Sequence, residues 1–484
     1  MVKLPGGIDM NRGNIWINIG IAALLVILAA VLGQIDRWRS ALESGEKAFR
    51  NANQRSVTIS RDRTESEPEI MVRFRPGVTI DEVRRIAALH NDRIEDEIEA
   101  VGGLYAIDDL DGATPEEVAG EYQAMSGLVT YAEPVMEIRL DDPEMSALRR
   151  PMRSGARASS YPNDPEFPDQ WALNNTGKHG GKENADIAAL KAWEKTQGSE
   201  DVVVAVLDTG VDYTHLDLAE NMWIRPANVP AYYDDELGAI DDVNGYDAEA
   251  GNGDPMDDNG HGTHVAGIIG AEGDNGEGIA GINWKIKILP LKFLGRGGFG
   301  STKNAIEAIN YAIDRKKNGV NIRIINASWG STQRSRALED AIRAAGDAGI
   351  LFVAAAGNNG TDNDRSPHFP SNYGLPNVIS VAALDRNDNL AGFSNFGLHS
   401  VHIAAPGREI LSTWLGNGYR EASGTSMATP QVAGVAALIL AANPNLSLPE
   451  LRKRLLKSVD RIDALKDKIA TGGRINAAIA LAER

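Results

Sequence analysis

The chain has 484 residues, 43% of them hydrophobic, and its 67 acidic and 49 basic side chains give a formal charge of −18. This composition excludes a disordered tail and a small disulfide scaffold, and the length suffices for two or three domains with cores of their own. The acidic balance argues against a nucleic-acid binder, because such proteins use Lys and Arg to neutralise phosphates. The chain contains no cysteine, so covalent catalysis would have to use Ser, Thr, Lys or a carboxylate.

An apolar segment, residues 15–32, runs near the N-terminus without a charged side chain. A helix of this length can span the hydrocarbon core of a bilayer at ~1.5 Å per residue. Because the segment is longer than a typical signal-peptide core, we expect residues 1–33 to form a membrane anchor, with a cleaved signal peptide as the alternative. The flanking basic residues do not settle the orientation, although alone they slightly favour a cytoplasmic C-terminal side.

A polar linker, residues 34–68, leads to a region where strand and helix patterns alternate, residues 69–140. Alternating apolar residues predict a strand from Glu69, and helical spacing predicts a helix over 79–90. A second strand, a second helix and a final strand follow at 104–107, from Thr114, and over 129–138. Thr114 and Glu117 fit a capping box. The order predicts a small ferredoxin-like β-α-β-β-α-β module, whose shape alone indicates no function.

The next segment, residues 141–160, carries four arginines among Pro, Gly and Ser and has no sustained apolar period. Such a segment is typical of an exposed, protease-accessible connector. A plain solvated loop is an equally good interpretation of the charges, but the position between two domains favours a processing site.

From Asp201 onward, short apolar runs alternate with amphipathic helical patterns such as 302–315 and 335–348. This order predicts a doubly wound α/β domain over 161–484, with a buried parallel sheet and with ligands at the carboxyl ends of the strands. The predicted strands are Val202–Leu207, Ile286–Leu291, Ile322–Ala327, Ile350–Ala356 and Val378–Ala382.

Three motifs in this domain carry reactive residue types: DTG from Asp208, HGTHVAG from His261, and GTSMATP, which contains Ser426. A serine hydroxyl becomes a nucleophile when an imidazole accepts its proton and a carboxylate orients that imidazole. Alone, Asp208 could be a capping carboxylate and His261 a structural histidine. In this order the motifs resemble the subtilisin-like serine proteases of the thermitase and fervidolysin type. We therefore expect Ser426 to be the nucleophile, His261 the base and Asp208 the orienting carboxylate.

Ser426 precedes a long apolar run, so the amides and dipole of a helix N-terminus would favour an oxyanion beside it. The segment 354–358 resembles the family's strand that carries the second oxyanion donor, which implies Asn358, with a plain turn asparagine as the alternative. His264 lies one helical turn from His261, but no acidic third ligand is fixed by the motif. We therefore do not expect a zinc site.

The resemblance also implies a substrate site in which an extended peptide pairs with two strand edges. These edges are Ser328, Trp329, Gly330 and Gly298, Phe299, Gly300. The aromatic rings of Trp329 and Phe299 could shape the pockets or pack inward. His368 stands where the family usually has a small residue at the floor of the S1 pocket, so the P1 preference stays open.

Calcium is the cofactor that the resemblance implies. Side-chain oxygens would come from Asp164, Asp217 and Asn275, and backbone carbonyls from Glu272, Glu277 and Ile279. A further acidic cluster could hold a second ion or form a solvated loop: Asp247, Asp254, Asp257 and Asp258.

Residues 69–140 resemble the propeptides of these relatives, which assist folding and then inhibit by lying across the active site. We therefore expect a serine endopeptidase made as an autoinhibited zymogen. One cleavage within 141–160 would activate it and free it from the membrane, so that the mature chain begins near Tyr161.

The expected partners are polypeptide substrates, the chain's own propeptide and a membrane bound through the N-terminal helix, and no nucleic acid. Calcium and the acidic surface favour an extracytoplasmic catalytic domain. A non-catalytic membrane-tethered binding protein, or a transpeptidase or macrocyclase using the same acyl-enzyme, are the alternatives.

Overall fold

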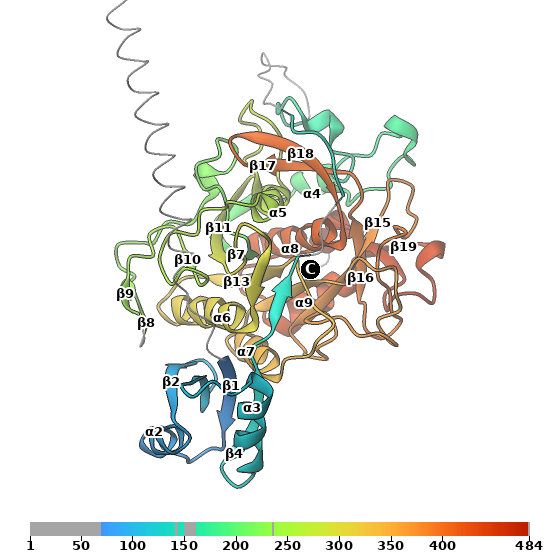
Figure 1. Ribbon diagram of the computed structural model, residues 1–484. Helices are drawn as coiled ribbons and strands as arrows, with labels where there is room; N and C mark the ends of the chain where they lie inside the picture. The colour runs from blue at the N-terminus through green and yellow to red at the C-terminus, as the bar shows by residue number, and fades with distance from the viewer. Residues whose placement is uncertain (1–68, 141–143, 150–160, 235–236, 483–484) are drawn as a thin grey trace, which may run out of the picture. The chain divides into compact units, whose positions relative to one another are not determined.

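The computed structural model describes residues 69–140, 144–149, 161–234 and 237–482 (Figure 1). They belong to one compact unit, Pro68–Arg484. The predicted anchor, the polar linker and most of the predicted connector lie outside the described residues.

The N-terminal module has the predicted β-α-β-β-α-β order (blue to teal in Figure 1). Its four strands form an antiparallel sheet in the order β2-β3-β1-β4. Thr114 and Glu117 form the predicted capping box at the start of α3. The elements are β1 Glu69–Phe74, α2 Ile80–Leu89, β2 Asp92–Glu97, β3 Leu104–Asp109, α3 Pro115–Ala124 and β4 Val129–Pro134.

The module differs from the expectation in two strands. β2 has the sequence DRIEDE, whose charges hide its strand character from an apolar-pattern search. The predicted final strand over 129–138 ends at Pro134, and a separate strand, β5 (Glu137–Arg139), follows it. β5 leaves the module and pairs with the second domain.

The second domain contains a nine-stranded sheet in the order β10-β11-β7-β13-β14-β15-β16-β20-β19. Every neighbouring pair is parallel except β19 with β20 at the edge. The five predicted strands correspond to five consecutive strands of this sheet, from β11 to β15 in the order given, which confirms the predicted α/β class. The strands are β7 Gly198–Asp208, β10 Tyr246–Asp247, β11 Lys285–Lys292, β13 Ile322–Ala327, β14 Leu351–Ala355, β15 Val378–Leu384, β16 Ile403–Pro406, β19 Val459–Arg461 and β20 Gly473–Ile475.

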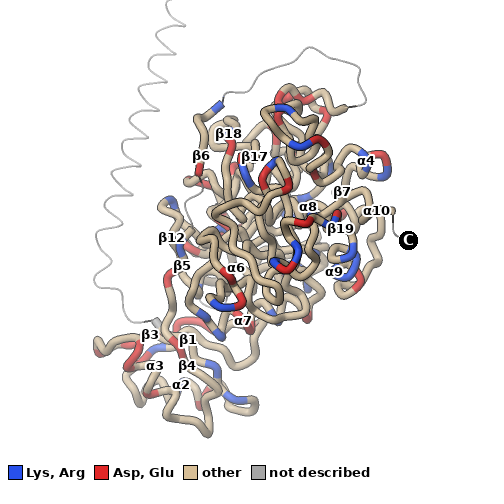
Figure 2. Tube along the Cα trace, turned by 90° about the vertical axis from the view of Figure 1, so that its right-hand side faces the viewer, with Lys and Arg blue, Asp and Glu red and all other residues tan. Residues whose placement is uncertain are grey.

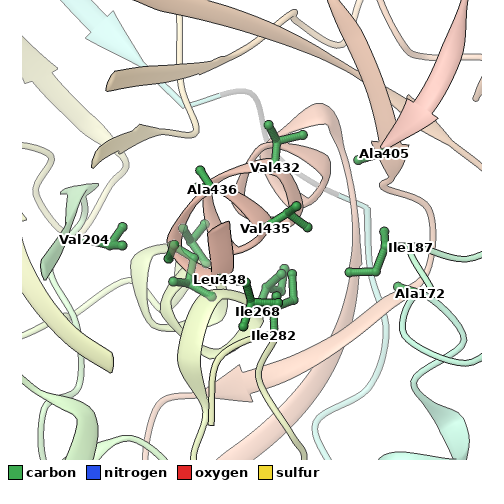
Figure 3. Packing of buried hydrophobic residues seen from close by; sticks show 14 of the residues in the cluster. Ala172, Ile187, Val204, Ile268, Ile282, Ala405, Val432, Val435, Ala436 and Leu438 are labelled. Atoms are coloured by element: carbon green, nitrogen blue, oxygen red, sulfur yellow. The ribbon is translucent and has the colours of Figure 1, made fainter. Parts of the chain in front are cut away.

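Helices cover both faces of this sheet. α5 (His261–Gly270) and α8 (Thr425–Ala442) pack on one face, and α6 (Thr302–Lys317) and α7 (Arg336–Asp347) on the other. In Figure 3 the side chains of α8 lie among residues of α5 and of β7. Among the described residues, α8 is the helix long and apolar enough to cross a membrane, but it is buried in the core.

The remaining elements are short. Two small sheets join the segment after β4 to the second domain: β5 pairs with β12, and β6 pairs with the β17–β18 hairpin (Figure 2). The remaining α-helices and strands are α4 Ala189–Trp193, α9 Leu448–Lys457, α10 Ala477–Ala482, β6 Glu144–Met145, β8 Tyr232–Asp234, β9 Gly238–Ile240, β12 Phe299–Ser301, β17 Ile410–Trp414 and β18 Gly418–Ser423.

Candidate active site

Asp208 and His261 meet at the carboxyl edge of the large sheet. Asp208 is the last residue of β7, and His261 is the first residue of α5. The imidazole Nδ1 lies 2.7 Å from Asp208 Oδ1, and both side chains are buried. Gly260 precedes the helix with a φ of 110°, and a Cβ there would collide with the ring of Trp414. The local backbone therefore requires glycine where the chain turns into the helix that carries His261.

Thr209 and Asp257 fix the start of α5 against β7. Thr209 Oγ1 donates to Asp257 Oδ1 over 2.9 Å and accepts the backbone N–H of Gly262 over 2.9 Å. Asp257 also accepts the backbone N–H groups of Gly260 and Thr263, each over 2.9 Å. A carboxylate that satisfies the free amides of a helix N-terminus holds that helix in place. This positioning role of Asp257 is an addition to the predicted site, and an acidic residue just before a helix is its usual signal in a sequence.

Ser426 is the second residue of α8 and is 3% exposed. Its Oγ donates to the carbonyl of Ser328 over 2.8 Å, and Ser328 Oγ donates to the carbonyl of Ser426 over 2.8 Å. This reciprocal pair ties the candidate nucleophile to the start of one predicted substrate strand.

Two donors converge beside Ser426. Thr425 donates its backbone N–H and its hydroxyl to Asn358 Oδ1, over 2.8 and 2.9 Å, which fixes the orientation of that amide. A Cβ placed on Gly424 would lie 3.5 Å from Asn358 Nδ2 and 3.6 Å from the backbone nitrogen of Ser426. Two nitrogen atoms that carry hydrogens therefore lie near Gly424, and the predicted oxyanion hole needs donors of this kind.

The other two histidines named from the sequence are buried. His264 Nε2 lies 3.1 Å from the carbonyl of Ile410 and 3.0 Å from that of Arg420, so it connects α5 to the β17–β18 hairpin. Burial lowers the pKa of His264 to about 3, so its ring is neutral. The ring of His368 lies against Gly330 and Gly357, where a Cβ on Gly330 would meet it at 2.0 Å.

The two predicted substrate edges both contact the segment that follows the N-terminal module. β12 pairs with β5 antiparallel, with Phe299 opposite Arg139. Leu140 donates its N–H to the carbonyl of Gly298 over 2.9 Å, and Arg139 forms an antiparallel bridge with Gly330. One strand of the chain therefore lies along both edges.

The two aromatic residues on these edges behave differently. The indole of Trp329 is buried, donates to the carbonyl of Leu207 over 2.8 Å and packs on Phe293, so it points inward. Phe299 is 39% exposed, and the guanidinium of Arg139 lies 4.6 Å from its ring centroid.

Asp164 and Asp217 form the centre of the predicted calcium site. Asp217 accepts the N–H of Ile279 over 2.9 Å and the side-chain amide of Asn275 over 2.9 Å. Asp164 Oδ2 accepts the N–H of Asp274, whereas its Oδ1 is buried without a hydrogen-bond partner. Burial raises the pKa of Asp164 to about 7 and that of Asp217 to about 8.

Asp164 and Asp217 are both buried, and the charge of Asp164 contributes to the raised pKa of Asp217. No ion pair with a basic side chain of the described residues compensates the two carboxylates, and a bound cation would do so. The remaining predicted ligands, Glu272 and Glu277, lie in the same loop, where Glu272 donates its N–H to the carbonyl of Asp217. No group of three or more acidic or histidine side chains suited to a metal occurs among the described residues. That observation is compatible with this site, because most of its predicted ligands are an amide and backbone carbonyls.

The second acidic cluster separates into individual contacts. Asp257 caps α5 as described, Asp258 pairs with Lys292 Nζ at 2.9 Å, and Asp254 accepts the hydroxyl of Tyr213. Asp247 Oδ1 accepts two backbone N–H groups of its own loop. These contacts favour structural roles over a second ion site.

Comparison with known proteins gives a consistent result. The model of the Subtilase family matches residues 199–473, more than half of the chain. Thermitase of Thermoactinomyces vulgaris is 35% identical over 316 residues, covering 65% of this chain and 97% of thermitase. A thermophilic serine proteinase of Bacillus sp. (strain AK1) is 41% identical over 271 residues, covering 56% of this chain and 59% of that protein. The chain thus spans about three fifths of the latter relative.

Among solved structures, fervidolysin from Fervidobacterium pennivorans, a keratinolytic enzyme related to subtilisin, superimposes with a TM-score of 0.66 at 26% identity. The match covers 88% of this chain and 62% of fervidolysin. A protease from Pseudoalteromonas arctica superimposes with a TM-score of 0.55 at 30% identity, covering 66% of this chain and 99% of that protein. Together with the family model and thermitase, these likenesses show that the chain belongs to the subtilase family.

Proposed function

We propose that this chain is a serine endopeptidase that hydrolyses peptide bonds through an acyl-enzyme on Ser426. The observation that carries the proposal is the 2.7 Å contact between His261 and Asp208 at the sheet edge where Ser426 begins a helix. His261 would take the proton from Ser426 Oγ as that oxygen attacks the peptide carbonyl, and would return it to the leaving amine. Asn358 Nδ2 and the backbone N–H of Ser426 would hold the oxyanion.

We further propose that residues 69–140 are an inhibitory propeptide. β5 and Leu140 occupy the strand edges at Gly298 and Gly330 that a substrate peptide would use. The likeness to fervidolysin covers 88% of this chain, more than residues 161–484 alone supply. While β5 is in place, a substrate cannot pair with the same edges.

The docking of the propeptide is supported by polar contacts on α7. Glu133 accepts the hydroxyl of Ser335 over 2.6 Å and the N–H groups of Arg336 and Ala337 over 3.0 and 3.1 Å. The carboxylate thus lies at the positive end of a twelve-residue helix. Tyr131 adds a hydrogen bond of 2.7 Å to Asp340 on the same helix.

The described part of the connector supports a particular processing order. Residues 144–149 remain on the catalytic domain, because β6 pairs with β18 and Arg149 lies 3.3 Å from Glu166 and 3.1 Å from Asp169. We propose that the first cleavage falls between Leu140 and Glu144, and that a second cut within residues 150–160 produces a chain beginning near Tyr161.

Calcium would be held by Asp164, Asp217 and Asn275 together with the carbonyls of Glu272, Glu277 and Ile279. When bound there, it would neutralise the two buried carboxylates and connect the start of the catalytic domain to the loop after α5. Its role would therefore be structural.

The membrane anchor also remains a proposal, supported by the apolar sequence of residues 15–32. The catalytic domain would lie outside the cytoplasm until cleavage releases it. Protease accessibility of a C-terminal tag in intact cells tests this topology.

An organophosphofluoridate tests the catalytic proposal directly, since it phosphorylates a serine that is activated by a neighbouring base much faster than it phosphorylates other hydroxyl groups. The expected result is a covalent adduct on the peptide carrying Ser426, lost in His261→Ala and retained in His264→Gln. An unlabelled Ser426 in cleaved wild-type protein would contradict the assignment. Product analysis with an added amine nucleophile separates hydrolysis from peptide-bond formation.

A further inference from the structure

A pair of acidic side chains meets across the interface between the N-terminal module and the second domain. Asp96 belongs to β2 and Glu307 to α6, and the two are 6% and 7% exposed. No hydrogen-bond donor among the described residues reaches either carboxylate oxygen of Glu307. The two carboxyl groups lie close enough for each to affect the pKa of the other.

The interface around this pair is closely packed. Lys303, one turn before Glu307, forms an ion pair of 2.6 Å with Glu95 of β2. Ala100 donates its N–H to Asn310 Oδ1 of α6 over 2.9 Å. Apolar residues of the module's sheet, including Met71, Leu104 and Tyr131, join the core under α6 and α7.

The backbone of β2 turns Asp96 toward this interface. Its pairing with β3 shifts register between Ile94 and Asp96, which indicates a bulge. A bulge re-aims the side chains of a strand. The irregular backbone of β2 therefore directs Asp96 toward α6.

The other charged groups that face the pair act in opposite directions. The buried carboxylate of Asp234 in β8 raises the pKa of both acids, whereas Lys303, which is itself paired with Glu95, lowers both but does not offset their burial. Tyr232 of β8 and Tyr246 of β10 stay neutral, because burial raises the pKa of each phenol far above its ordinary value.

Two carboxyl groups in contact can form a hydrogen bond only if one of them carries a proton. Burial raises the pKa of Glu307 well above its ordinary value, and it also raises that of Asp96. When both groups are ionised, like charges face each other in a desolvated interface.

We propose that Asp96 and Glu307 form a proton-dependent latch, which holds the propeptide tightly when they share a proton and loosens it as the pH rises. This inference rests on the proposed propeptide function and adds its regulation. We call the state in which residues 69–140 are docked on the second domain the closed state. Formation of the closed state takes up protons, because Asp96 and Glu307 bind protons more tightly there than after the two parts separate. The stabilisation is therefore complete at acidic pH and is lost as the pH rises through the closed-state pKa values.

The magnitude follows from proton linkage. Each proton released on opening raises the opening constant by up to about tenfold per pH unit. One proton therefore raises the opening constant by up to roughly 1000-fold between pH 5 and pH 8, a limit reached when its pKa lies above that interval in the docked state and below it after separation.

Hydrogen exchange on the full chain carrying Ser426→Ala, which cannot process itself, tests the latch. Protection of β5 and β12 is measured from pH 5 to pH 9 and corrected for intrinsic exchange rates. We expect protection to fall as the pH rises, and the fall to be largely removed by Asp96→Asn combined with Glu307→Gln. Tyr131→Phe is the matched control, because it removes a hydrogen bond at the same interface and should lower protection equally at every pH.

The outcomes separate the two proposals. Protection that is high and independent of pH in the parent would overturn the latch and leave the inhibitory propeptide intact. An absence of protection at every pH would overturn the docked propeptide itself. The parent's own pH profile keeps the test decisive even where the double variant fails to fold.

Discussion

Substitution of Asn358 by alanine tests the proposed oxyanion hole. The side chain has two functions in the structure: Nδ2 faces the space beside Gly424, and Oδ1 accepts two hydrogen bonds from Thr425. Removing the first should affect only the reaction, because the negative oxygen exists only in the transition state and the intermediate. Removing the second should affect folding stability.

The two effects have different sizes. Loss of one oxyanion donor lowers kcat about 100- to 1000-fold, or about 2.7–4 kcal/mol, a range measured in a protease of this same family. Loss of two ordinary hydrogen bonds lowers the free energy of unfolding by about 1–3 kcal/mol. We therefore expect a large fall in kcat, a nearly unchanged KM and a moderate loss of stability.

The assay is hydrolysis of a chromogenic peptide by protein whose cleavage is complete by mass spectrometry, paired with urea denaturation. Asn359→Ala is the matched control, because Asn359 is the adjacent, exposed asparagine. A fall in kcat of less than about fivefold for Asn358→Ala, with the control unchanged, would refute the assignment of Asn358.

Three further predictions concern calcium, the propeptide contact and the support of His261. Chelation of calcium with EGTA should lower the free energy of unfolding and Tm, because it leaves two buried carboxylates whose pKa burial raises to about 7 for Asp164 and to about 8 for Asp217. The loss of free energy should grow from about pH 4 to about pH 8, by up to about 1.4 kcal/mol per pH unit for each proton, and level off at higher pH; a Tm unaffected by EGTA from pH 6 to 9 would contradict the site. Glu133→Gln in the Ser426→Ala chain should raise the opening constant of the interface, measured by hydrogen exchange, by about 5- to 30-fold, since it removes a negative charge at the N-terminus of α7. Unchanged exchange would show that this contact does not stabilise the interface. Thr209→Val should reduce the free energy of unfolding by about 1–3 kcal/mol and lower kcat, because it breaks the contacts to Asp257 and to α5. A variant with the kcat and stability of wild type would contradict the positioning role of Thr209.

The core of the catalytic domain was predictable from sequence because its strands are buried on both faces. The run Val202–Leu207 is apolar throughout and lies within β7, and the run Ile322–Ala327, with four apolar residues out of six, has the same bounds as β13. β2 could not be predicted in this way, because its sequence DRIEDE has little apolar pattern. Its acidic residues Glu95 and Asp96 contact α6 instead. The break between β4 and β5 arises because β5 pairs with β12, which lies 160 or more residues further along the chain. A local sequence pattern contains no information about such a distant partner.

The site residues divide in the same manner. Asp208, His261 and Ser426 can be proposed from sequence because each lies in a short motif of chemically necessary residues, and the structure places His261 Nδ1 2.7 Å from Asp208 Oδ1. From sequence, Asp257 is a candidate for an ion site, because a cluster of aspartates has the same pattern whether it binds cations or backbone amides. Only the contacts to Thr209 and to the start of α5 separate the two.

The measurement that tests the central claim most directly is the N-terminal sequence of every species formed by the purified full chain with calcium, compared between wild type and Ser426→Ala by mass spectrometry. We predict that wild type is first cut between Leu140 and Glu144 and later within residues 150–160, whereas Ser426→Ala stays intact. Identical fragments from both proteins, or no cleavage of either, would contradict a self-processing serine protease.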